Sequence, residues 1–154
     1  MNTPTPPATL RLSVGPRQTL AEWGDDGRRS LPVGTAVLGP ASAAGPSAIA
    51  IENAIQVVED QIEGLVPRVP RGGRLVVSAD TLAPLQRGGA IAGLAQGAIA
   101  LSQIEREYQS LAARAVGAPS ARGSGFDDPA GDAVVLILRE VMHHLGFDAL
   151  HAAA

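Results

Sequence analysis

The spacing of apolar residues changes along this chain, and that change constrains the fold more than any other feature. Residues 10–14 alternate apolar and polar side chains, which is the period of a half-buried strand. Two later segments, 51–65 and 134–145, repeat apolar residues at intervals of three and four, which is helical. A short apolar run lies between them at 75–77 and fits a strand buried on both faces.

The first forty residues predict an antiparallel β-meander. Residues 9–14 form its first strand, and residues 17–23 predict a second, although they would equally suit a helical turn. Asp26-Gly27 is a hairpin signal, and a third strand is expected at 31–39, at an edge because Pro32 interrupts its hydrogen bonding. Residues 1–8 are expected to be a proline-stiffened disordered tail before a single domain at 9–151.

Three helices are expected after the meander. The first spans 47–65, with Ser47 as its N-cap. Asp80 is expected to cap the segment after the buried strand, and the longest helix is predicted from about Gly89 to Val116. The last helix spans 128–146, with an aspartate cap at its start and Gly146 just after its end. The fold class is therefore α+β: a meander, a helix, one buried strand and two further helices.

The apolar faces of the first and last helices are narrow, and this predicts self-association. Each is a seam of the kind that pairs helices, so a homodimer formed through these helices is expected. Gly89, Gly93 and Gly97 recur at helical spacing and favour a close contact with another backbone. The alternatives are a helix that starts after these glycines, or a loop that holds a phosphate.

The composition excludes several classes of protein. The chain of 154 residues has no cysteine and no lysine, which removes disulfides, thiolate chemistry, Schiff-base lysines and P-loops. A net charge of -3 argues against nucleic acid as a partner. No signal peptide or membrane span is apparent, so a cytoplasmic protein is expected, and the use of arginine alone as the cation suggests a bacterium with GC-rich codons.

All three histidines lie near the end of the chain, at positions 143, 144 and 151. Glu140 precedes His143 by one helical turn, so Glu140, His143 and His144 are a candidate metal or acid–base site. The alternative is a solvated helix face, because the seam places His143 about 160° from the apolar side. Further ligands would have to come from another helix or subunit, and the candidates are Asp127, Asp128 and Asp132.

A second candidate site lies in the proline-rich segment 67–74. Arg68, Arg71 and Arg74 recur every third residue, which would align them in an extended loop and let them bind an anion or nucleotide. They would equally pair with the acidic helix before them or face solvent.

The sequence thus favours a small self-associating protein that serves as a binding, scaffold or accessory module. Another protein is one partner that such a module could bind. The alternatives are a metal-dependent or acid–base enzyme and an anion-binding module. A divalent metal is the one cofactor that the residues suggest.

Overall fold

The chain folds around a mixed six-stranded β-sheet with strand order β3-β2-β1-β4-β6-β5. The computed structural model describes residues 3–5, 7–40, 42, 45–86, 91, 93, 96–121, 123–126 and 128–154. The strands are β1 (Thr9–Val14), β2 (Thr19–Trp23), β3 (Gly27–Leu31), β4 (Arg74–Val77), β5 (Ala98–Ala100) and β6 (Ala149–Ala152). Strand β4 runs parallel to β1 and to β6, and the other neighbouring pairs are antiparallel.

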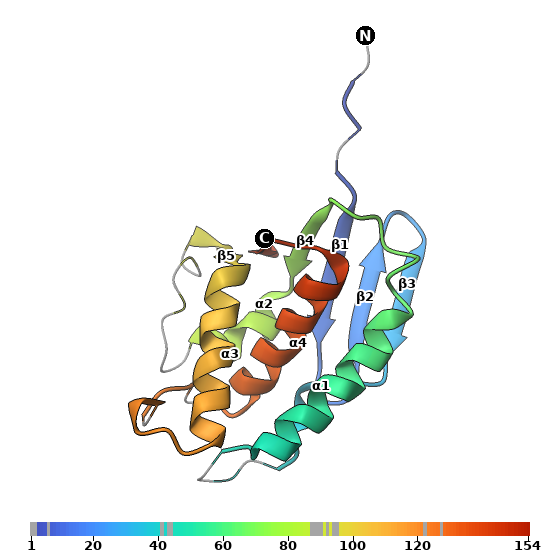
Figure 1. The fold of residues 1–154 in the computed structure, drawn as a ribbon. Helices are drawn as coiled ribbons and strands as arrows, with labels where there is room; N and C mark the ends of the chain where they lie inside the picture. Colours follow the sequence, from blue (N-terminus) through green and yellow to red (C-terminus); the bar gives the residue numbers. More distant parts are fainter. Residues whose placement is uncertain are drawn as a thin grey trace.

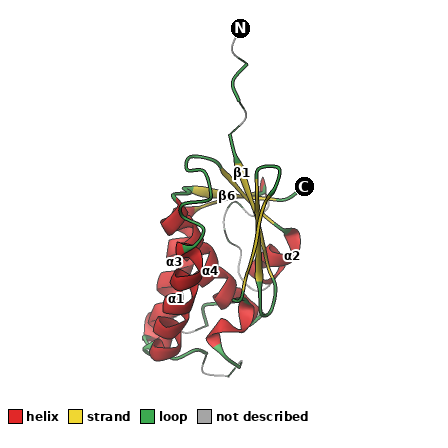
Figure 2. Ribbon diagram, turned by 90° about the vertical axis from the view of Figure 1, so that its right-hand side faces the viewer, coloured by secondary structure: helices red, strands yellow, loops and turns green. Residues whose placement is uncertain are grey.

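The helices are α1 (Ala48–Glu63), α2 (Ala79–Leu82), α3 (Leu101–Ala115) and α4 (Ala130–Leu145). Figure 1 shows α4 lying between α1 and α3, and Figure 2 shows these three helices on one face of the sheet with the short α2 on the other side. The core lies between the sheet and this helix layer, where the inward side chains of β1, β4 and β6 are buried. This architecture confirms the predicted α+β class. No helix in the described residues has the length and apolar character needed to cross a membrane.

The predicted β-meander is present, but its third strand comes earlier than expected. Strand β3 occupies residues 27–31, so the prediction of a strand at 31–39 was wrong. The polar side chains of this strand are tolerated because it lies at the edge of the sheet. Residues 35–38 instead form a 3₁₀ helix, because Gly34 lets the chain press against the β1–β2 turn. A Cβ at Gly34 would lie 2.1 Å from the carbonyl oxygen of Gly15. The same oxygen accepts a hydrogen bond from the N–H of Thr35.

Helix α1 and the ends of α4 follow the sequence closely. The Ser47 side chain accepts the Ala50 N–H at 3.1 Å, as expected of an N-cap. At the start of α4, Asp128 accepts the N–H of Ala130. At its end Gly146 is left-handed, with φ 76 and ψ 38, and Phe147 donates its N–H to the carbonyl of Met142.

The prediction of a narrow apolar seam on the last helix was wrong. In α4 eleven of sixteen residues are buried, including neighbours such as Leu136 and Ile137 that point in different directions. The helix is covered by the sheet below it and by α1 and α3 on its flanks (Figure 1). The residues on which the predicted dimer rested are therefore used within the chain, and self-association stays a prediction.

The long helix predicted from Gly89 to Val116 was also wrong, since α3 begins only at Leu101. Gly93 and Gly97 have φ values of 91 and 73, left-handed conformations that an α-helix does not contain, and Gly89 lies outside the described residues. The late helix start is thus the correct alternative. Strand β5 precedes the helix and pairs with β6, a strand that the sequence did not predict.

Two expectations about strand β4 need correction. Its outer side chain, Val76, is half-buried, so the strand is central in the sheet without being fully buried on both faces. Ser78 rather than Asp80 caps the following helix, because the Ser78 hydroxyl accepts the Thr81 N–H and Asp80 lies exposed in the first turn.

Candidate metal centre

Polar side chains gather on α4 near its C-terminal end, within a helix that is otherwise largely apolar. They are Arg139, Glu140, His143 and His144. Helix α4 has α1 on one flank and α3 on the other (Figure 1). Side chains on either flank of α4 therefore contact one of these helices and are shielded from solvent. Glu140 is only 3% exposed, so the alternative of a solvated helix face is wrong for this residue.

The side of this group that faces α3 is centred on Glu105. Nε2 of His143 and Nε of Arg139 both hydrogen-bond to Oε1 of Glu105, the latter at 2.9 Å. Partial burial raises the pKa of the Glu105 carboxyl, but the hydrogen bond from His143 and the charge and hydrogen bond of Arg139 outweigh it and hold the pKa below its ordinary value. The Arg139 guanidinium also lies over the ring of Tyr108, 4.0 Å from its centre.

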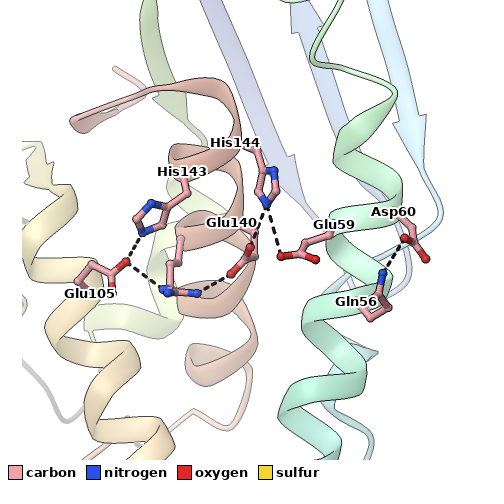
Figure 3. Close-up of polar contacts among 8 residues, drawn as sticks. Gln56, Glu59, Asp60, Glu105, Glu140, His143 and His144 are labelled. Carbon is pink, nitrogen blue, oxygen red and sulfur yellow. Dashed lines mark hydrogen bonds and ion pairs between the residues drawn. The ribbon is translucent and has the colours of Figure 1, made fainter.

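The side that faces α1 is centred on His144. Its Nε2 atom lies 3.4 Å from Oε2 of Glu140 and 3.5 Å from Oε1 of Glu59 (Figure 3). The other oxygen of Glu140, Oε1, accepts a hydrogen bond of 2.6 Å from Arg139. The two sides therefore join through Arg139 into one chain of contacts that spans all three helices.

Glu59, Glu140 and His144 can supply one ligand atom each to a metal ion, and these atoms all lie within 4.8 Å of one another. Two of these residues belong to the predicted set, while His143 is engaged with Glu105 on the other side of α4 and is 44% exposed at its side chain. Glu59 was not predicted as a ligand. The sequence feature that could have pointed to it is the composition of the first helix, which contains acidic residues but no basic residue to pair with them.

The aspartates named as further ligands lie elsewhere. Asp132 is eight residues before Glu140 on the same helix, about 12 Å away along its axis. It forms a two-pronged ion pair with Arg114 of α3, with distances of 2.7 and 3.2 Å. This pair helps to line a hollow of about 530 Å³, which also includes Leu38 and Phe126. Asp128 caps α4, and Asp127 is outside the described residues.

The second candidate site, the arginine loop, is on the surface. Arg68 and Arg71 lie in the turns between α1 and β4, and Arg74 is the first residue of β4. All three residues are exposed. The pairing of these side chains with the acidic residues of α1 is not found among the described residues, which leaves them facing solvent.

No protein-family model matches this sequence, and no curated protein matches it either. Solved structures do match in fold. The Ppx/GppA enzyme of Aquifex aeolicus has a TM-score of 0.65 and 13% identity over 97% of this chain and 54% of its own. An exopolyphosphatase-like protein has a TM-score of 0.65 and 15% identity over 99% and 58%.

An exopolyphosphatase from Cytophaga hutchinsonii is similar to the same extent, with a TM-score of 0.62 and 14% identity over 97% of this chain and 54% of its own. This chain thus spans about half the length of the structures that it matches. At such low identity the likeness is one of fold: the chain has the architecture of a portion of Ppx/GppA-type phosphatases.

Proposed function

We propose that this protein binds a divalent transition-metal ion through Glu59, Glu140 and His144. The observation that carries the proposal is the meeting of three ligand atoms from α1 and α4 within 4.8 Å. An imidazole nitrogen with two carboxylate oxygens suits Zn²⁺ and related ions. Three protein ligands also leave a coordination position for water, as in catalytic metal sites.

The charges around the cluster support a cation. Glu59 and Glu140 bring two carboxylates to His144, and Arg139 contacts only one of them. Glu140 is nearly inaccessible to water, so solvent screens its charge poorly. A metal ion bound between these side chains would offset the remaining negative charge.

The two adjacent histidines, His143 and His144, provide a test variant and its matched control. We expect Zn²⁺ or Co²⁺ to raise the melting temperature of metal-stripped protein that carries no His-tag, and His144→Ala or Glu140→Gln to abolish that rise. His143→Ala removes the neighbouring imidazole, which contacts Glu105 instead, and should leave the rise intact. Absence of any rise in the wild type, or equal loss in both histidine variants, would contradict the proposal.

Metal-assisted hydrolysis of a phosphate compound is a second candidate function, and the shared fold favours it. The matching structures are described as phosphatases and exopolyphosphatases. A metal ion with open positions can polarise a phosphoryl oxygen and activate water. The test is phosphate release from polyphosphate with Zn²⁺, Mn²⁺ or Mg²⁺ present. Release that Glu140→Gln abolishes would support it, and metal binding without release would restrict the function to binding.

Self-association as a scaffold and anion binding at the arginine loop stay predictions. Light scattering across a dilution series checks the first, and a monomer of 15.7 kDa at every concentration would contradict it. For the second, phosphate compounds should stabilise the wild type but not a variant in which Arg68, Arg71 and Arg74 are glutamine.

A further inference from the structure

Arg139 is the junction between the two sides of the polar group. Its Nε donates to Glu105 at 2.9 Å, and its Nη1 donates to Oε1 of Glu140 at 2.6 Å. Its guanidinium is also packed over the ring of Tyr108. Contacts to two carboxylates and one ring hold this planar group in a single orientation.

This orientation leaves Glu140 with one oxygen for a further partner. Oε1 is taken by Arg139, while Oε2 faces Nε2 of His144 at 3.4 Å. The buried carboxylate has little room to turn, since its side chain is 4% exposed. A metal ion at this place could therefore take one bond from Glu140 and not two.

We propose that Arg139 is a positioning residue that selects the type of metal ion by limiting Glu140 to a single bond. The inference rests on the metal binding proposed above. Zn²⁺ and Co²⁺ accept four ligands with one oxygen from each carboxylate. Ions that prefer many oxygen ligands, such as Mn²⁺ and Ca²⁺, gain more from a carboxylate that offers both oxygens. Blocking Oε1 thus disfavours the second group.

The test compares Kd values for Zn²⁺ and Mn²⁺ in the wild type and in Arg139→Gln. We expect the preference for Zn²⁺ to fall about tenfold in the variant, a size typical of groups that orient a metal ligand. The visible spectrum of bound Co²⁺ should shift from the intense bands of four-coordination towards the weak bands of higher coordination. A purely structural role for Arg139 would change stability without changing this ratio or this spectrum.

Arg114→Gln is the matched control. Arg114 is also a partly buried arginine paired with a carboxylate of α4, with a side-chain exposure of 19% against 22% for Arg139, but it lies towards the other end of the helix. The Arg114→Gln variant should be less stable than the wild type and should keep the wild-type ratio of the Kd values for Zn²⁺ and Mn²⁺. Arg139→Met serves if Arg139→Gln does not fold, because it keeps an unbranched apolar stem beside Tyr108 and leaves Oε1 of Glu140 without this donor, and it should lower the ratio in the same direction.

The outcomes separate the two proposals. Wild-type protein that binds none of these ions overturns the proposed function and this inference together. Binding in the wild type with the same Zn²⁺ to Mn²⁺ ratio in the variants overturns the role of Arg139 and leaves the metal site standing. A ratio that falls equally in Arg114→Gln also overturns it, because the effect would then follow from general loss of stability.

Discussion

Helices α1 and α4 have the same length of sixteen residues and the same spacing of apolar residues, yet their surroundings differ. In α1 four residues are buried, and in α4 eleven are. Helix α1 lies at the border of the helix layer, while α4 has a helix on each flank and the sheet beneath it (Figures 1 and 2). The position of a helix in the layer therefore decides how much of its surface is buried. In the central helix α4 even a charged residue, Glu140, is buried.

The largest difference is expected for a matched pair of isoleucines. Ile137→Ala in α4 should lower the free energy of unfolding by about 2–5 kcal/mol, because the residue is 1% exposed and leaves a cavity. Ile49→Ala in α1 removes a side chain that is 70% exposed and should change it by less than about 0.5 kcal/mol. Urea unfolding measures both, and similar values would mean that α4 is not the central helix.

A smaller difference is expected for two glutamates, measured with a chelator present. Glu140→Gln should cost about 1–3 kcal/mol, since it weakens a buried hydrogen bond to a charged group. Glu52→Gln on the exposed face of α1 should stay within about 0.5 kcal/mol. If Glu140→Gln proved neutral, the buried carboxylate would contribute nothing to the stability of the metal-free protein, and this prediction would be wrong.

The glycines that end the two helices give a third comparison. Gly146 after α4 is left-handed at φ 76, so Gly146→Ala should cost about 1 kcal/mol. Gly64 after α1 is right-handed at φ -66, so Gly64→Ala needs only a shift of the exposed Arg29 side chain and should be close to neutral. Thermal unfolding of both variants checks the order, and a larger loss in Gly64→Ala would contradict it.

The smallest effect concerns the carboxylate that joins α3 to α4. Because the folded pKa of Glu105 is lowered, its contribution to stability is present above the ordinary pKa of about 4.5 and is lost as the pH falls through the folded value. Wild-type protein should therefore lose stability relative to Glu105→Gln as the pH falls below about 4.5. Parallel unfolding curves from pH 6 to pH 3 would show that the Glu105 contacts with His143 and Arg139 do not contribute.

Local signals in the sequence were sufficient where one short segment decides the structure. The Ser47 cap, the left-handed Gly146 and the alternation in 9–14 were all predicted, because each depends on neighbours within a few residues. The same reasoning failed for the glycines at 93 and 97, since helical spacing of glycines carries no information about their φ angles. It also missed β6, whose four residues become a strand only because β4 and β5 lie on either side.

The sequence by itself determined the α+β class, the meander, the limits of α1 and α4 and the exclusion of cysteine and lysine chemistry, since these follow from composition and local periodicity. Only the tertiary structure decided that α4 lies between two helices, that Glu59 joins Glu140 and His144, and that His143 turns to Glu105 instead. Glu59 and Glu140 are far apart in the chain, and the packing of α1 against α4 brings them together. Such contacts depend on how helices pack across the sheet, which apolar spacing along one helix does not specify.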